Sequence, residues 1–347
     1  MDTSVLLLPC VVGAKSLTDI GDTFRSLASE GRLVVPGQVA RGFAQNRPTK
    51  LGEVFKQVLD KKSKAVRLDV GSYPLLDGLP GYARVIEIEG KINDLIGQYQ
   101  DALSRVINHI RGWTWNDPVS LLYGELFAQG VVLDPQFDEA AVREDLSRRQ
   151  KHKIPPGYKD AGKEDGGIGD LLIWHTILRV GEDLERDLLL ITGEQKTDWW
   201  HRSNSESLYP RHQLVDEYRR ASHGRSFHMV SLSEFLDLTA ASADTIEEVR
   251  QEEAGAVTML ALQDRWPEIV EGVERLNRRF AALLPSARPI SVSNQRIVLE
   301  APYEFHRDRM NSDDVRSVLE SVVSTLLGRN MSVETVLKGD QSHYKVV

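Results

Sequence analysis

The chain has 347 residues, of which 41% are hydrophobic and 27% charged, and its formal net charge is −8. This charge excludes a protein coated in basic surface for non-specific nucleic-acid binding, although it leaves room for a local basic groove. The single cysteine, Cys10, excludes an intramolecular disulfide framework and a multi-cysteine zinc site. Its apolar neighbours favour a small core residue over a nucleophile.

The length and the hydropathy set two further expectations. A chain of this size exceeds the usual single domain, so we expect two domains. No apolar run approaches the roughly 20 residues that a membrane-spanning helix needs, and the first residues lack the basic start of a secretory signal. We therefore expect a cytoplasmic protein.

The first part of the chain, up to about residue 240, alternates short apolar runs with helical patterns. The runs at 32–36, 187–192 and 227–231 are apolar at nearly every position, which is typical of strands buried on both faces of a parallel sheet. Between the first two runs, residues 84–110 show helical spacing and predict a long helix or a pair of helices. The sequence therefore predicts an α/β domain.

The second part begins after an acidic segment. Residues 241–256 are acidic and poor in aromatics, which predicts a weakly packed linker or an exposed helix. An amphipathic helix from Trp266, a hairpin around Asn294 and a helix closed by Gly328 then predict a small α+β domain. We expect the chain up to residue 242 to fold without this domain.

Carboxylates stand at the places where open α/β sheets bind ligands. Asp170 precedes an apolar-periodic helix and is placed to cap it, while Glu194 and Asp198 follow the strand predicted at 187–192. Asp2 lies at the start of the chain. Carboxylates that converge repel one another unless a divalent cation lies between them, which makes a magnesium or manganese site a reasonable inference. The residues alone leave a simple N-cap and a metal site equally open.

Five segments carry a resemblance to a known family. They are "DTSVLL" from residue 2, "VVPGQVARGFAQNR" from 34, "KIPPGYKDAGKEDGGIGDLLIW" from 153, "LLLITGEQKTDWW" from 188 and "YPRHQLVDEY" from 209. In this order they resemble the bacterial PIN-like domain family over residues 1–240. The resemblance implies a three-layer α/β/α domain with a central parallel sheet, and a nuclease in which Mg²⁺ or Mn²⁺ activates water for attack on a phosphodiester.

The same resemblance implies roles for individual residues. Asp2, Asp170 and Glu194 correspond to the metal-binding acids. Asp160 and Asp198 belong to the family's extended motifs and are expected at the catalytic site.

Cations and aromatics near these motifs are candidates for substrate contacts. Lys163 and Lys196 could hold the scissile phosphate as point charges, or could be solvated surface groups. A cluster of arginines is the best candidate for the local basic patch: Arg202, Arg211, Arg219, Arg220 and Arg225. Trp199 and Trp200 could stack on bases, but a pair that follows a buried strand more often packs in the core.

Two departures from the family pattern bear on activity. The segment after residue 36 usually carries a glutamate before its phenylalanine, whereas this chain has Gly42. Restoring a carboxylate there is expected to add a metal ligand. The apolar strand that usually leads into the first aspartate does not precede Asp2, so either the true start lies upstream or this strand is absent. Both departures favour a weak or inactive copy.

The second part has a resemblance of its own. Residues 265–337, with a tryptophan that opens the first helix and the segments "FHRDRM" and "LLGRNMSV", resemble the C-terminal domain of the DNA polymerase III gamma/tau subunit. The resemblance implies a KH-like α+β module that contacts a protein partner or a second copy. The expected division is a nuclease domain at 1–240, an acidic linker or helix at 241–258 and an interaction domain at 259–347.

Together these features predict a metal-dependent endonuclease that acts on nucleic acid, RNA more than DNA. A role as a toxin or in defence is what the family resemblance implies. Two alternatives stay open. One is a weak or inactive PIN-like scaffold, and the other is a replication-associated adaptor that acts through its C-terminal domain.

Overall fold

The computed structural model describes residues 1–159, 166–203, 206–292, 296–327 and 330–338. It forms two compact units. One comprises Met1–Lys50 with Pro118–Val257, and the other Leu51–Asp117 with Thr258–Val347. None of the helices in the described ranges combines the length and hydropathy that crossing a membrane requires.

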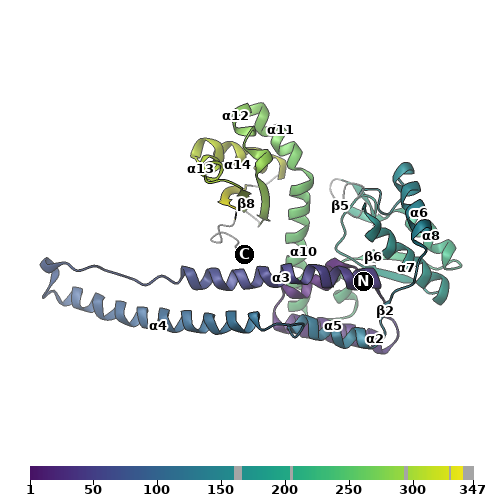
Figure 1. Cartoon of the computed structure of the whole chain (residues 1–347), viewed down its shortest axis with the longest axis horizontal. Coiled ribbons are helices and arrows are strands. Elements are labelled where there is room, and N and C mark those ends of the chain that lie inside the picture. Colours follow the sequence, from purple (N-terminus) through teal and green to yellow (C-terminus); the bar gives the residue numbers. More distant parts are fainter. Residues whose placement is uncertain (160–165, 204–205, 293–295, 328–329, 339–347) are drawn as a thin grey trace. The chain divides into compact units, whose positions relative to one another are not determined.

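Short parallel strands lie at the centre of the first unit, as Figure 1 shows for its teal part. Strand β1 (Val35–Pro36) pairs in parallel with β2 (Val132–Leu133), and β3 (Leu188–Ile191) with β6 (Phe227–Val230). Each of the three predicted apolar runs contains one of these strands, so the α/β prediction is confirmed. An antiparallel pair, β4 (Trp200–Ser203) and β5 (Glu206–Pro210), follows β3.

Helices surround these strands and bury one hydrophobic core. Its largest fully buried side chains include Trp174, Tyr123, Tyr218 and Phe24, and Cys10 packs at its edge as expected. The helices of this unit are α1 (Thr3–Leu7), α2 (Ala14–Ser29), α5 (Pro118–Ala128), α6 (Glu139–His152), α7 (Ile168–Leu184), α8 (His212–Ala221) and α9 (Leu232–Leu238).

The acidic segment after residue 240 is a helix, α10 (Ala243–Asp264), and its first half is not weakly packed. Ile246 and Val249 are buried in the core of the first unit. Glu248 Oε1 accepts a hydrogen bond from the Gly13 amide at 2.8 Å, and Glu253 Oε1 accepts one from the Leu232 amide at 2.7 Å. Of the two expectations for this segment, the helix is correct. The idea of a weakly packed connection is wrong for residues 243–253, because both apolar side chains and carboxylates attach them to the first unit.

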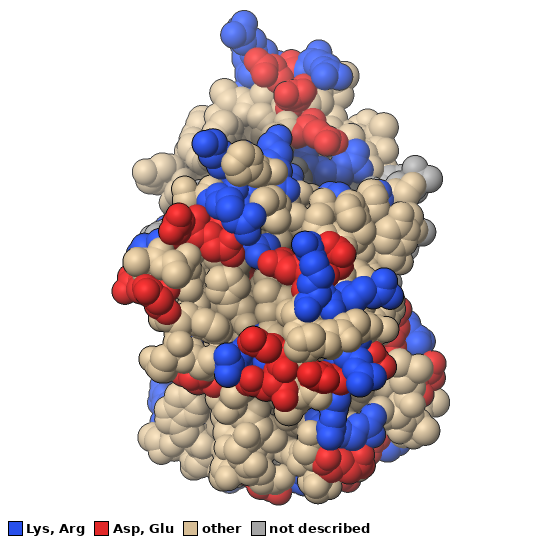
Figure 2. All heavy atoms as spheres, turned by 90° about the vertical axis from the view of Figure 1, so that its right-hand side faces the viewer, with Lys and Arg blue, Asp and Glu red and all other residues tan. Residues whose placement is uncertain are grey.

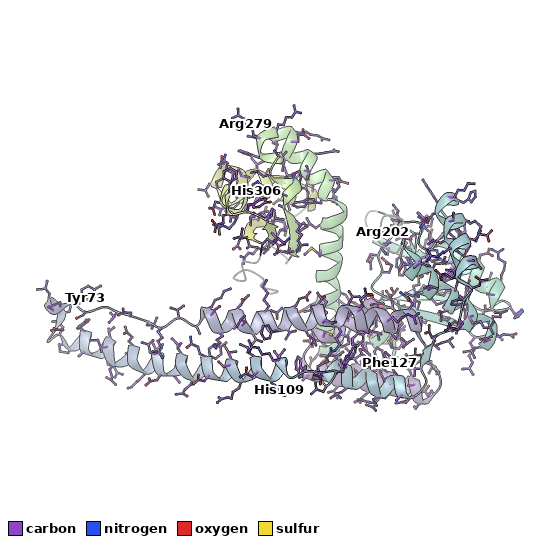
Figure 3. All side chains as sticks on the ribbon, in the orientation of Figure 1. Tyr73, His109, Phe127, Arg202, Arg279 and His306 are labelled. Carbon is purple, nitrogen blue, oxygen red and sulfur yellow. The ribbon has the colours of Figure 1, made fainter. Side chains whose placement is uncertain are left out.

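A long helical hairpin lies between β1 and α5 in the sequence. Helix α3 (Gly37–Lys64) and helix α4 (Pro80–Arg111) run side by side, with Tyr73 at the far end of the hairpin (Figures 1 and 3). The segment that joins them is held by α4, because Asn93 Oδ1 accepts from the Leu68 amide at 2.9 Å and Gln100 Nε2 donates to the Ala65 carbonyl at 2.7 Å. The long helix predicted at 84–110 is confirmed.

The C-terminal domain has the predicted α+β composition. Helix α11 (Trp266–Leu276) begins at the predicted tryptophan, which packs against the domain core, and the predicted hairpin is an antiparallel strand pair. Its turn at Asn294, like Gly328 after the last helix, lies outside the described residues. The remaining elements are α12 (Arg278–Ala281), β7 (Arg288–Val292), β8 (Arg296–Ala301), α13 (Glu304–Asn311), α14 (Asp313–Leu327) and β9 (Ser332–Leu337), with strand order β7-β8-β9.

Candidate active site

The first two residues connect the two parallel strand pairs of the first unit. The Met1 nitrogen donates to the Val34 carbonyl at 3.1 Å, and the Asp2 amide donates to the Ile191 carbonyl at 3.0 Å. These bonds fix Asp2 next to the carboxyl end of β3, the edge at which open α/β sheets bind ligands.

The Asp2 carboxylate is firmly oriented. Its Oδ1 accepts from the Thr3 amide at 2.6 Å and caps helix α1, while its Oδ2 accepts from the hydroxyls of Ser4 at 3.0 Å and Thr192 at 2.9 Å. Three such bonds hold the carboxylate in one orientation.

Glu194 lies in the loop directly after β3 and is tied to Asp2 through Thr192. The Thr192 hydroxyl, which donates to Asp2, accepts from the Glu194 amide at 3.0 Å. Glu194 Oε1 accepts from the amides of Gln195 and Lys196, both at 2.9 Å, and Trp200 Nε1 donates to the Glu194 carbonyl at 2.6 Å. These bonds to Glu194 therefore fix the conformation of the loop.

Lys196 brings Asp170 to the same place. Its ammonium lies 2.9 Å from Glu194 Oε2 and 3.4 Å from Asp170 Oδ2, and the three side chains are 18% to 32% exposed. Asp170 is not the N-cap that we expected, because α7 begins two residues earlier at Ile168 with Gly167 as its cap. In the first turn, the helix dipole still stabilises its charge. The three predicted metal-binding acids therefore belong to one connected network.

Asp198, in contrast, does not face this network. Its side chain is fully buried, and Oδ2 accepts from the Gly157 amide at 3.0 Å. The expectation that Asp198 is a member of the catalytic site is not supported by this geometry, because its carboxylate instead fixes the "IPPG" segment. Asp160 and Lys163, the other two motif residues, lie outside the described residues.

Of the five arginines near the site, Arg211 and Arg220 have partners within the protein, whereas Arg219 and Arg225 are exposed. Arg211 Nε donates to the Thr197 carbonyl at 2.7 Å, so this residue supports the loop of Glu194 and Lys196. Arg220 forms an ion pair with Asp216 at 2.5 Å, whereas Arg202 lies on β4, half-buried. Figure 2 shows one face on which basic and acidic side chains are interspersed. That face has no continuous basic patch.

Trp199 and Trp200 pack in the core and are not available for stacking on bases. They are 4% and 8% exposed, and the rings of Trp199 and Trp174 meet edge to face with their centroids 6.1 Å apart. The interpretation of the pair as packing is confirmed.

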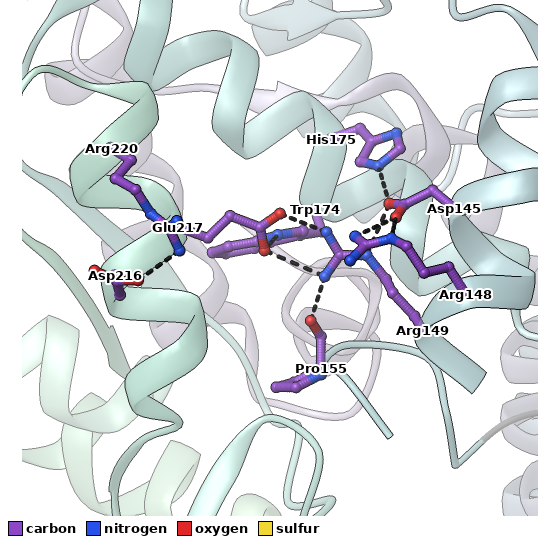
Figure 4. A network of polar contacts seen from close by, with 9 residues as sticks. All are labelled: Asp145, Arg148, Arg149, Pro155, Trp174, His175, Asp216, Glu217 and Arg220. Atoms are coloured by element: carbon purple, nitrogen blue, oxygen red, sulfur yellow. Dashed lines mark hydrogen bonds and ion pairs between the residues drawn. The ribbon is translucent and has the colours of Figure 1, made fainter. Parts of the chain in front are cut away.

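The "IPPG" segment is held by a buried ion-pair network that Figure 4 shows. The guanidinium of Arg149, 1% exposed, donates to both carboxylate oxygens of Glu217 and to the Pro155 carbonyl. Trp174 Nε1 donates to Glu217 Oε2 at 2.9 Å, and Arg149 Nε donates to Asp145 Oδ2 at 2.8 Å. This motif therefore joins helices α6, α7 and α8 beneath the candidate site.

Comparison with known families agrees with this geometry. The model of the PIN-like domain matches residues 1–214, more than half of the chain. The chain belongs to the PIN-like domain family. Residues 251–346 match the C-terminal domain of DNA polymerase III subunit tau. No curated protein and no solved structure matches the chain. Both resemblances stated from the sequence are confirmed, and the PIN-like part has a nuclease-type fold.

The acids of this PIN-like domain have the chemistry of divalent-cation ligands. Their oxygens are the hard ligands that Mg²⁺ and Mn²⁺ prefer, and the ammonium between Asp170 and Glu194 shows that the position favours a cation. In the described part of the chain, however, no three acidic, histidine or cysteine side chains are grouped closely enough to hold a metal as they stand. The donor set fits the metal in its chemistry, and binding would require Lys196 to move.

Sequence reasoning missed Thr192 and a pocket beside the PIN-like network. The pocket, about 310 Å³, lies where β1 and β2 end and is lined in part by Gln38, Arg41, Asp134 and Phe137. Arg41 pairs with Asp134 at 2.7 Å. Asp134 directly follows the apolar run "VVL" at 131–133. A carboxylate after an apolar run is the pattern that identified Glu194, and the same pattern could have identified Asp134.

Proposed function

We propose that the chain is a metal-dependent endonuclease that hydrolyses phosphodiester bonds, with single-stranded RNA as its substrate. The observation that carries the proposal is a network of three acids from separate segments. The Lys196 ammonium pairs with both Asp170 and Glu194, and the Thr192 hydroxyl links Asp2 to the Glu194 loop. Such a cluster is costly to keep charged unless a cation is present, and it lies at the strand ends where this fold class binds ligands.

Each residue has a distinct role in this proposal. Asp2, Asp170 and Glu194 would hold Mg²⁺ or Mn²⁺, which when bound supplies Lewis-acid polarisation of the phosphate and an acidified water. Lys196, displaced from the acids, places its charge on the scissile phosphate. Thr192 keeps the Asp2 carboxylate oriented toward the Glu194 loop. Asp160 and Lys163 are further candidates for this site.

Cleavage of labelled single-stranded RNA and DNA with manganese, magnesium or chelator tests the proposal. Asp170→Asn should abolish cleavage. Asp183→Asn is the matched control, because Asp183 lies on the same helix and pairs only at the surface with Arg179 at 2.9 Å. Cleavage that persists in chelator, or that both variants lose equally, contradicts the proposal.

A second candidate is an adaptor without nuclease activity. Two observations favour it: Lys196 pairs with two of the acids, and the C-terminal part matches the tau subunit domain. An adaptor should bind RNA or a protein partner without cleaving nucleic acid under any metal condition. Wild-type cleavage that depends on Asp170 rules it out as the sole function.

A further inference from the structure

Helix α4 carries a row of apolar side chains on its exposed surface. The row recurs in alternating steps of three and four residues: Val85, Ile88, Ile92, Leu95, Tyr99, Ala102 and Val106. Five of the seven are more than 40% exposed, and Leu95 reaches 64%. A monomeric soluble protein rarely exposes a continuous apolar strip of this length.

The hydrogen bonds that hold the joining segment lie on another face of α4. The residues of α4 that bond the joining segment are Tyr82, Glu89, Asn93 and Gln100. At 3.6 residues per turn they share one face, and the apolar row is rotated from that face by about a third of a turn. The row therefore lies on a different face of α4 from the one that bonds the joining segment.

The spacing identifies what kind of surface would cover it. A repeat of 3.5 residues is the signature of a coiled coil, in which such residues form the seam between two helices. The row spans three heptads, or about 32 Å of helix, which is about the shortest length typical of a coiled coil. Its members are β-branched, leucine or aromatic residues apart from Ala102, and none carries a charge.

We propose that the row is a dimerisation seam that pairs with the same row of a second copy of this chain, in parallel. Two copies present identical strips, as a two-fold interface requires. Bases follow one flank of the seam (Arg84, Lys91 and Arg105), so antiparallel helices would place like charges together. In a parallel pair they face the other flank instead, where Arg84 would meet Glu89 and Lys91 would meet Ile96.

The hairpin tip supports the parallel arrangement. Leu75 is 95% exposed, and Tyr73 and Leu79 are each more than half exposed. Tyr73 lies at the far end of the hairpin in Figure 3. Parallel pairing brings the two tips together, so that these side chains are covered by their counterparts.

Light scattering coupled to size-exclusion chromatography of the full chain tests the seam. Wild type should be a dimer at micromolar concentration, and Ile88→Glu with Leu95→Glu should be a monomer of unchanged helicity by circular dichroism. Ile86→Glu is the matched control, because Ile86 is the same residue type, 48% exposed and on another face of α4, and it should stay dimeric. Leu95→Ala, which keeps the helix propensity, should raise the dimer Kd at least tenfold.

Cross-linking then tests the direction of pairing. Val85→Cys should form disulfide-linked dimers on mild oxidation, whereas wild type with Cys10 alone should not. A monomeric wild type, or a dimer that survives both seam variants, overturns the proposal. A seam-dependent dimer that Val85→Cys cannot cross-link overturns the parallel arrangement.

Discussion

A Cβ atom at Gly42 would lie 2.7 Å from the hydroxyl oxygen of Thr3, the residue after Asp2. Real Cβ atoms do not approach a heavy atom so closely, so α3 and the start of the chain are in contact because position 42 has no side chain. The carboxylate that the family pattern has at this position would therefore point toward the candidate site. The sequence alone suggested that one substitution restores this carboxylate, but the structure shows that Thr3 or α3 must also shift.

Gly42→Glu should destabilise the protein by about 1 to 3 kcal/mol, because overpacking forces Thr3 or α3 to shift. Adding Thr3→Ala should recover most of that loss and tighten manganese binding, since space for the new carboxylate then exists. Urea unfolding and metal titration measure the two effects. Gly52→Glu is the control, because Gly52 lies on the same helix with no atom near its Cβ position. If Gly42→Glu is as stable as wild type, Thr3 moves aside without cost and position 42 is not crowded.

Removing the Lys196 ammonium should increase the affinity of Asp170 and Glu194 for a metal ion. Lys196→Met leaves Asp170 and Glu194 without the ion pairs at 3.4 and 2.9 Å, so manganese should raise its melting temperature more than that of wild type. Cleavage should fall nevertheless, because the variant lacks the charge proposed to bind phosphate. Lys151→Met, on the exposed surface of α6, should behave as wild type. An equal metal-induced shift in all three proteins would remove Lys196 from the cation position.

The central strands could be predicted from the sequence because their runs are apolar at nearly every position. Burial on both faces was expected but is incomplete, since Leu189 on β3 and His228 on β6 are exposed. Glu194 could be placed because a residue directly after such a strand must lie at the sheet edge. Asp198 also follows this strand, and the sequence therefore predicted it at the site. Position in the sequence does not distinguish a carboxylate that faces the sheet edge from one that turns inward to Gly157. The hydrogen bond from Thr192 to Asp2 joins residues 190 positions apart, so no local sequence pattern predicts it.

The packing of α10 shows the same limit. An acidic composition indicates a solvated surface, and it does so correctly for residues such as Glu247 and Arg250, which are exposed. It gives no sign that single carboxylates such as Glu248 and Glu253 bond to backbone amides far away in the sequence. Composition averages over a segment, whereas such contacts depend on individual side chains.

Acid should weaken the first unit through Asp145. Burial raises the pKa of this carboxyl, but hydrogen bonds from Arg149, Arg148 and His175 outweigh burial and lower the pKa to about 2. Because the folded-state pKa lies below the unfolded value, the ionised carboxylate stabilises the fold at pH values above about 4. That contribution, on the order of 2 kcal/mol, is lost as the pH falls from about 4 to about 2.

Asp145→Asn should remove this part of the pH dependence. At pH 7 the variant should be less stable than wild type by about 2 kcal/mol or more, since it also leaves Arg149 buried with one partner fewer. The difference should shrink toward pH 2. Urea unfolding across pH 2 to 7 measures it, with Asp216→Asn as a surface control whose ion pair with Arg220 is mostly exposed. A stability difference that does not change with pH would mean that Asp145 acts through packing alone.

The first half of α10 should determine where the PIN-like domain can be cut. Val249 is fully buried and Ile246 is 9% exposed in the core of the first unit, so a chain that ends at residue 242 exposes the surface that both cover. We expect that chain to be insoluble or to melt well below one that ends at residue 257.

In the full chain, Val249→Ala should cost about 2 kcal/mol through the cavity that it leaves. Arg250→Ala, whose side chain is exposed and pairs with Glu247 at 3.0 Å, should change the stability by less than about 0.5 kcal/mol. Thermal unfolding of the two truncated chains and the two variants distinguishes the possibilities. If the chain ending at 242 is as stable as the longer one, α10 belongs with the C-terminal domain, and its contacts with the first unit contribute little.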